Sequence, residues 1–127
     1  MSTALEDKEA IRELLANYCF NIDRPNPKAL IALFSDDAAW EMNGIGRFTG
    51  PALHEFLTKT AEGGSKMRHV TSNEVISVNG NNATARSYIV LFVPGEKPTP
   101  DFSAFYEDKL VKTGGRWLFK ERVVATA

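Results

Sequence analysis

The first part of the chain places apolar residues at the period of an α-helix. From about Leu5 to Ile22 they recur at three- and four-residue steps, at Ala10, Leu14, Leu15, Tyr18, Cys19 and Ile22. This spacing predicts one helix with an apolar stripe that faces a core. The segment 24–27 (Arg-Pro-Asn-Pro) ends the helix, because proline fixes φ and disfavours helix in the residue before it.

Two shorter helices are predicted next. The first is capped by Asn26, starts at Pro27 and is closed by residues 35–37 (Ser-Asp-Asp), with inward positions at Leu30, Ile31, Leu33 and Phe34. Residues 38–42 then suit a strand and residues 43–46 (Asn-Gly-Ile-Gly) a loop. A further helix follows Gly50-Pro51 and ends at residues 62–64, with an apolar face made of Leu53, Phe56 and Leu57.

From Lys66 onward the pattern is that of β-strands. Four runs are predicted, roughly Met67–Val78, Ala83–Val93, Phe102–Lys112 and Arg116–Val124. Residues 79–82 and 113–115 suit tight hairpins, and residues 94–100 form a longer, proline-rich loop. Helices first and strands afterwards predict an α+β domain over residues 1–127, in which three N-terminal helices pack on one face of a curved, mostly antiparallel sheet.

Composition and charge limit the binding partners and the cellular location that we expect for this chain. A chain of 127 residues with 43% hydrophobic content supports one core. The 15 Lys and Arg residues are scattered and nearly balanced by 16 Asp and Glu, so nucleic acid is not an expected partner. No signal peptide or run of about 20 apolar residues occurs. We therefore expect a cytoplasmic protein with no membrane partner.

The sequence lacks the residues that several common kinds of functional site require. Cys19 is the only cysteine, so an internal disulfide or a thiolate-rich zinc site is excluded, and its apolar surroundings indicate buried packing. Two histidines without clustered carboxylates make a poor metal site. Gly44-Ile-Gly46 lacks the third glycine of a dinucleotide fingerprint, and no GxSxG elbow occurs. We expect no metal and no cofactor.

Separate stretches of the chain, in order, resemble the SnoaL-like (NTF2-like) family. They are residues 9–23, 29–40, 46–50, 67–73, 83–88, 106–111 and 115–119. The resemblance implies a cone-shaped fold around an apolar pocket for a small organic molecule. It also implies a homodimer formed through the outer face of the sheet, with a trimer as the alternative. Because this fold hosts many chemistries, fold alone does not decide function.

The same resemblance implies a pair of catalytic residues. In the scytalone dehydratase-like and dehydrochlorinase-like branch, an Asp after the first helix holds a strand His that removes a carbon-bound proton, and Asp23 and His69 match those positions. Imidazole suits proton transfer near neutral pH, and a carboxylate fixes its tautomer. The ordinary alternatives are a turn-forming Asp and a structural His on the strand face shared by Met67, Thr71 and Asn73.

Other family features are matched incompletely. Tyr18 is a third catalytic candidate, with its hydroxyl in the pocket or else at a wet core edge. Dehydrochlorinase-like members use an Arg late in the chain. This sequence has Val111 and Lys112 at that place, which weakens the case for halide elimination. No second acid matches the oxyanion site of the isomerase branch.

Substrate contacts are predicted from strand faces and aromatic residues. Arg86 and Tyr88 share a face with Val90 and Phe92; if that face lines the pocket, Arg86 polarises a ligand oxygen, and if not, it is a solvated charge. The aromatic candidates for the pocket wall can equally be core filler, and they are Trp40, Phe48, Phe56, Phe92, Phe102, Phe105 and Tyr106. His54 is expected to be exposed and has no assigned role.

The sequence thus predicts a cofactor-independent enzyme of lyase or cyclase type with a small, largely apolar substrate. The alternative is a non-catalytic domain of the same fold that binds a small molecule or mediates assembly. An Asp–His contact in an open pocket would favour the enzyme. A closed cavity or a separated pair would favour the alternative.

Overall fold

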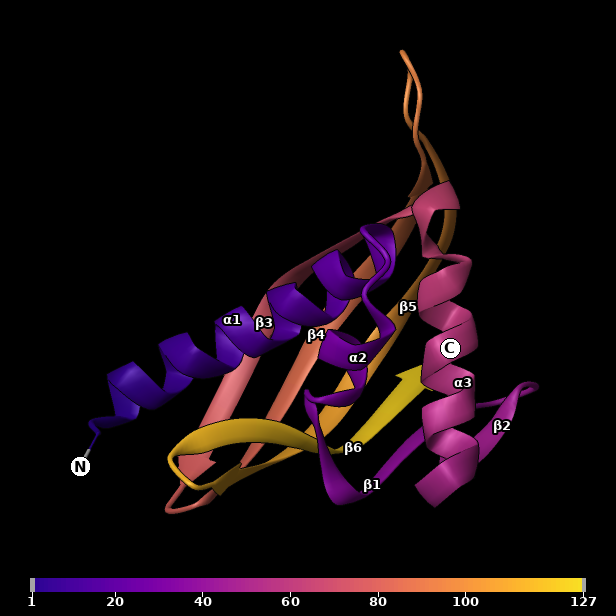
Figure 1. Ribbon diagram of the computed structural model, residues 1–127. Coiled ribbons are helices and arrows are strands. Elements are labelled where there is room, and N and C mark those ends of the chain that lie inside the picture. Colours follow the sequence, from indigo (N-terminus) through magenta and orange to yellow (C-terminus); the bar gives the residue numbers. More distant parts are fainter. Residues whose placement is uncertain (1, 127) are drawn as a thin grey trace.

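One six-stranded sheet forms the frame of the molecule, which a computed structural model describes for residues 2–126 (Figure 1). The strand order is β2-β1-β6-β5-β4-β3, and only the β1–β6 pair is parallel. The mostly antiparallel, curved sheet was expected. The strands are β1 (Phe34–Met42), β2 (Gly46–Thr49), β3 (Arg68–Asn79), β4 (Asn82–Val93), β5 (Thr99–Thr113) and β6 (Arg116–Ala125).

Three α-helices cover one face of this sheet (Figure 1). They are α1 (Ala4–Asp23), α2 (Pro27–Ile31) and α3 (Gly50–Glu62), and a short 3₁₀ turn, η1 (Gly64–Lys66), follows α3. Thr3 and Glu6 form a capping box at the start of α1, and the Asn26 side chain caps α2, as expected. Among the helices of residues 2–126, none is both long and apolar enough to cross a membrane.

The predicted boundaries fail at three places. α2 ends at Ile31, and Phe34 already begins β1, so the expected helix close at residues 35–37 lies inside a strand. The cause is tertiary: the Phe119 amide donates to the Leu33 carbonyl at 2.8 Å, and the Phe34 ring packs on the Phe119 ring. β2 occupies residues expected to form a loop and lead into α3, and β5 begins two residues inside the proline-rich loop.

The two faces of the sheet differ in burial. Along β4 and β5, Ala85, Ile89, Tyr106 and Leu110 point toward the helices and are at most 6% exposed. The positions that alternate with this inward set, Arg86, Tyr88, Glu107 and Lys109, are exposed, which is the period of two expected for a sheet covered on one side. The helices and the inner face therefore share one apolar core.

A buried carboxylate attaches the start of α1 to the sheet. Asp7 Oδ1 accepts hydrogen bonds from the Ser2 hydroxyl (2.6 Å), the Trp117 Nε1–H (3.1 Å) and the Lys112 ammonium (3.1 Å). These donors, the Ser2 hydroxyl first, hold the pKa of Asp7 below its ordinary value. The ionised form of Asp7 is therefore favoured by folding.

This pKa shift predicts how Asp7→Asn will behave. A lowered pKa stabilises the folded state above the unfolded Asp pKa of about 3.9, and that contribution disappears as pH falls through the folded value. Denaturant unfolding should show the variant to be less stable than wild type at pH 7, and the difference should shrink below about pH 4. A difference that does not change with pH would contradict this role.

Candidate functional site

Asp23 and His69 meet where the end of α1 reaches the start of β3. The Asp23 Oδ1 atom lies 2.6 Å from His69 Nδ1, and Asp23 Oδ2 accepts the His69 main-chain N–H at 2.8 Å. The expected contact is present, and the residues are 46 positions apart in sequence. With Nδ1–H donating to the carboxylate, the lone pair of the ring lies on Nε2. Within residues 2–126, Nε2 has no hydrogen-bond partner.

This contact is largely buried. The His69 and Asp23 side chains are 13% and 10% exposed. A groove of about 210 Å³ between α1 and the free edge of β3 reaches His69. Its wall consists of Arg12, Leu15, Ala16, Cys19, Phe20, Val70, Thr71 and Glu74. A small molecule in this groove would reach the imidazole.

Cys19 forms part of the groove floor. Its Sγ lies 3.3 Å from the Thr71 hydroxyl, and the residue is 6% exposed, as its apolar surroundings predicted. Burial raises the pKa of the Cys19 thiol, so the thiol is protonated at neutral pH. Cys19 is thus packing and not a nucleophile.

The space beneath α1 is filled by aromatic side chains. Trp40 Nε1 donates to the Tyr18 hydroxyl at 3.1 Å, and the Tyr18 and Tyr106 rings pack edge to face at 5.9 Å. Tyr18 is 2% exposed and Tyr106 is 3% exposed. Burial raises the pKa of Tyr18, and raises that of Tyr106 further. The Tyr18 hydroxyl, for which a pocket and a wet core edge were the two alternatives, accepts a hydrogen bond from Trp40 inside the core.

A second aromatic group lies by α3. The rings of Phe48 and Phe56 stack at 4.3 Å, and Trp40 lies 4.4 Å from Phe56. Phe56 and Phe102 pack against the core, whereas Phe92 is half-buried and outside it. Trp40 and Phe56 thus face the interior, as a lining role requires, while Phe92 does not join them.

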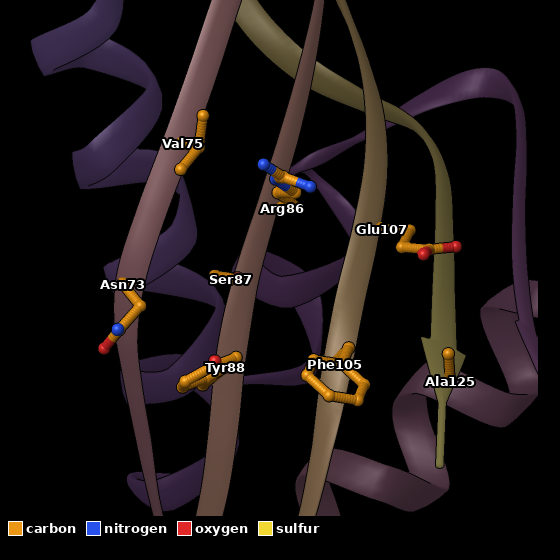
Figure 2. Close-up of a pocket in the computed structure, with 8 residues that line it drawn as sticks. All are labelled: Asn73, Val75, Arg86, Ser87, Tyr88, Phe105, Glu107 and Ala125. Carbon is orange, nitrogen blue, oxygen red and sulfur yellow. The ribbon is translucent and has the colours of Figure 1, made fainter. Parts of the chain in front are cut away.

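Of the two alternatives for Arg86 and Tyr88, the solvated position is the one found, and neither residue lines the inner pocket. Both are exposed on the face turned away from the helices, because Ala85, Ser87 and Ile89 take the inward positions of β4 (Figure 2). Phe105, another candidate for the inner wall, is 43% exposed and packs on Tyr88 with ring centroids 5.4 Å apart. Asn73 also leaves the face of His69, since a bulge between Ser72 and Val75 changes the alternation.

The core contains a buried ion pair that was not predicted from the sequence. Arg122 on β6 donates from Nε and Nη2 to the two Asp108 carboxylate oxygens, at 2.8 and 3.0 Å, and both side chains are 0% exposed. Burial alone would lower the pKa of Arg122, but the Asp108 carboxylate more than offsets this and raises it. Val111 and Lys112 lie on β5, whereas the buried Arg122 lies on β6, the next strand.

Two signals in the sequence could have revealed this pair. Asp108 occupies an inward position between Tyr106 and Leu110, where a charge needs a buried partner. Arg122 is harder to find, because strict alternation from Phe119 would turn it outward. A register shift beside Lys120 reverses the alternation and turns Arg122 inward. Within residues 2–126, no three His, Cys, Asp or Glu side chains gather as metal ligands.

Gly64 fixes the position of the end of α1. A Cβ atom at Gly64 would lie 1.8 Å from the Ile22 carbonyl oxygen, so η1 packs directly on the backbone next to Asp23. Only glycine allows this approach. The site therefore depends on a close contact between two backbone segments as well as on its own side chains.

The comparisons with known proteins agree with this architecture. The SnoaL-like domain family matches residues 3–123. No curated protein matches the sequence at a significant level. A Nostoc punctiforme protein of unknown function with a cystatin-like fold is 29% identical, with a TM-score of 0.85, over 96% of this chain and 91% of that one.

Named activities belong to some of the other similar structures, of which two are described. A candidate scytalone dehydratase from Novosphingobium aromaticivorans is 29% identical, with a TM-score of 0.79, over 97% of this chain and 85% of that one. A hexachlorocyclohexane dehydrochlorinase from Novosphingobium barchaimii is 19% identical, with a TM-score of 0.76, over 94% of this chain and 86% of that one. The second likeness establishes the fold alone.

We predict that Gly64→Ala destabilises the protein and displaces Asp23. The added methyl group should lower the free energy of unfolding by about 2 kcal/mol, because backbone must move to admit it. Gly95→Ala is the matched control, since its Cβ would meet open space, and it should change stability by less than about 0.5 kcal/mol. Denaturant unfolding measures both effects, and the NMR shift of the His69 amide reports Asp23. An unchanged amide shift in Gly64→Ala would contradict the positioning role.

Proposed function

This chain belongs to the SnoaL-like domain family, and on that premise we propose that it is a cofactor-independent enzyme of lyase or cyclase type. The substrate is a small, largely apolar organic molecule, and His69 is the base that removes a carbon-bound proton. The observation that carries the proposal is the 2.6 Å contact between His69 Nδ1 and Asp23, which leaves Nε2 free beside a groove.

In the proposed reaction each residue of the pair has one task. His69 Nε2 takes a proton from a carbon next to an electron-withdrawing group. Asp23 holds the ring in the correct tautomer and stabilises the imidazolium that forms. The electron pair of the broken C–H bond then expels a leaving group or shifts within the molecule. Positioned proton transfer of this kind contributes about 10² to 10⁴ in rate.

The substrate class follows from the groove and the relatives. Leu15, Ala16, Cys19, Phe20 and Val70 make most of the groove wall apolar. The activity named for the scytalone dehydratase relative, dehydration, is an elimination. An elimination from a neutral carbon skeleton is the reaction that both observations support.

One observation favours the non-catalytic alternative. Tyr18, Trp40 and Tyr106 fill the interior, so the space beneath α1 is packed where an open pocket would be expected for an enzyme. In that reading the Asp23–His69 contact only ties α1 to β3. The two readings differ in whether carbon-bound protons exchange.

We expect the wild-type protein to catalyse hydrogen–deuterium exchange in a panel of small cyclic ketones and β-hydroxy ketones in D₂O. His69→Ala and Asp23→Asn should each lower the exchange rate by about 10² or more. The double variant should be little slower than His69→Ala, because the two residues act as one unit. Proton NMR follows the exchange directly.

The control for this experiment is His54→Ala. His54 lies on α3, away from the groove, and should leave the exchange rate unchanged. Equal exchange by wild type and His69→Ala, or additive losses in the double variant, would reject the catalytic pair and favour the binding or assembly domain.

We also propose a homodimer formed through the outer face of the sheet. Exposed apolar side chains gather there (Figure 2), and two hollows of about 530 and 460 Å³ open on this face. The apolar residues are Val75, Tyr88 and Phe105, which are 52%, 47% and 43% exposed. A surface of this kind is unusual for a monomer.

The charges on this face suit a twofold axis. Arg86 and Glu107 are neighbours in the β4–β5 register, and no ion pair joins them within residues 2–126. In a twofold interface, Arg86 of one copy can meet Glu107 of the other, and the same contact recurs symmetrically.

A charge-reversal series tests this interface. Arg86→Glu or Glu107→Arg alone should raise the dimer dissociation constant by about tenfold or more, because like charges then meet. The Arg86→Glu/Glu107→Arg variant should recover most of the loss. Lys97→Glu, in the loop that follows β4, is the control. Sedimentation velocity would refute the proposal by finding a monomer at all concentrations, or no recovery in the double variant.

A further inference from the structure

A free edge of the sheet runs beside the proposed base. β3 is the last strand of the sheet, so within residues 2–126 one of its two edges has no neighbouring strand (Figure 1). The groove of His69 lies along this edge, because His69, Val70 and Thr71 all line it, although successive side chains of a strand point to opposite faces. A molecule in the groove therefore meets β3 edge-on, where main-chain amide and carbonyl groups are presented.

The hydrogen bonds between β3 and β4 decide which amides face the groove. A two-residue turn joins these strands, so the pair beside the turn, Asn79 and Asn82, exchanges hydrogen bonds. Every second residue of β4 after Asn82 also bonds toward β3, which includes Val90, opposite Val70. Thr71 belongs to the alternate pair, whose N–H and C=O point away from β4.

The Asp23 contact gives the same answer independently. The His69 main-chain N–H donates to Asp23 Oδ2 at 2.8 Å, so it points away from β4. Thr71 follows two residues later, before the bulge that begins after Ser72. Main-chain groups of a strand repeat their direction every two residues. Both arguments therefore direct the Thr71 N–H toward the free edge, and Thr71 lines the groove.

The spacing allows one small molecule to touch both residues. The Thr71 N–H lies two residues, roughly 6.7 Å of strand, beyond the His69 N–H. Asp23 binds that N–H and the His69 ring through its two oxygens, so the imidazole is held at the same edge. A hydrogen bond of about 2.9 Å and a reacting contact of about 3–3.5 Å are each about half of this interval. Neighbouring atoms of one molecule can thus meet the Thr71 amide and His69 Nε2.

The chemistry of the groove favours a neutral acceptor at the Thr71 amide. Most of the wall is apolar, and its two charged residues besides the base, Arg12 and Glu74, carry opposite signs. The Asp23 carboxylate beside the His69 ring would repel a bound carboxylate. A main-chain N–H is an uncharged donor, and it suits a carbonyl oxygen on which negative charge develops during reaction.

We propose that the main-chain N–H of Thr71 binds the carbonyl oxygen of the substrate and stabilises the enolate that forms from it. This inference rests on the proposed function and names its electron-withdrawing group. His69 Nε2 takes the proton from the neighbouring carbon, the C–H electron pair forms the C=C bond of the enolate, and the carbonyl π pair moves to oxygen. The enolate then re-forms the carbonyl and expels a leaving group, which takes the proton from His69, or it recovers that proton at carbon.

Two probes of similar shape test the contact on the intact protein. Acetophenone has a carbonyl oxygen, and ethylbenzene has no acceptor. In ¹⁵N–¹H NMR titrations, saturation with acetophenone should move the Thr71 amide proton downfield, while the Val70 amide, which is bonded to β4, stays nearly unchanged. Acetophenone should bind about threefold or more tightly than ethylbenzene. Equal binding of both probes, binding of neither, or an unmoved Thr71 amide overturns the proposal.

Thr71→Pro removes the proposed donor. Proline is tolerated on an edge strand where the lost N–H faces outward, so this variant should fold, whereas Val70→Pro loses an N–H bonded to β4 and should unfold at a clearly lower denaturant concentration. The reference is Thr71→Ala, which also lacks the threonine side chain but retains the N–H. A Thr71→Pro variant less stable than Val70→Pro overturns the assigned direction of the amide.

The binding and rate of Thr71→Pro are compared with those of Thr71→Ala. The proline variant should bind acetophenone no more tightly than ethylbenzene, and its deuterium exchange into the acetophenone methyl group should be about 10² or more slower. If neither proline variant folds, the α-hydroxy acid analogue of threonine at position 71 replaces the N–H alone by an ester oxygen, with wild type as its reference. An unchanged preference for acetophenone in the chain that folds overturns the proposal.

This proposal and the proposed function fail in different ways. His69→Ala should retain the preference for acetophenone, because the amide donor does not include the imidazole. If wild type shows the preference and the Thr71 amide shift but exchanges no carbon-bound protons, the proposed catalysis is wrong and the carbonyl site stands. If exchange depends on His69 but Thr71→Pro changes neither binding nor rate, the carbonyl site is wrong and the catalysis stands.

Discussion

The structure depends first on the Asp23 carboxylate, which joins the end of α1 to the start of the edge strand β3. One oxygen accepts the His69 main-chain N–H and the other meets the His69 ring, so one side chain fixes both the strand and the imidazole. Gly64 allows η1 to pack on the backbone beside this carboxylate. Backbone and side-chain contacts therefore determine the same position, so the fold fixes the place of the imidazole relative to α1.

The sheet separates two kinds of surface, and the period of two along β4 and β5 assigns each residue to one of them. The inner surface, with Tyr106 and Asp108, is continuous with the helices. The outer surface, with Arg86, Tyr88 and Phe105, has no covering element within residues 2–126. Side chains on opposite faces of the same strands therefore have different surroundings, and a change to one face need not disturb the other.

Much of this arrangement could be predicted from the sequence, and the failures have physical causes. The α1 stripe and the hairpin turns gave the elements, and the resemblance paired Asp23 with His69 across 46 residues. The start of β1 was missed because Phe119 draws Leu33 and Phe34 into the sheet, a contact that local propensity does not contain. The direction of Arg86 and Tyr88 could not be decided from the sequence, because alternation groups residues by face without saying which face is covered.

Bulges explain the most consequential error. A single extra residue reverses which side chains point inward, and neither the bulge beside Lys120 nor the one after Ser72 has a glycine or proline to mark it. The first turns Arg122 into the core, and the second turns Asn73 out of it. Asp108 offered the better signal, since a carboxylate among inward apolar positions requires a buried cation. Arg122 satisfies that requirement only if it points inward. The inward direction of Asp108 on β5 therefore implies the bulge on β6 that turns Arg122 toward it.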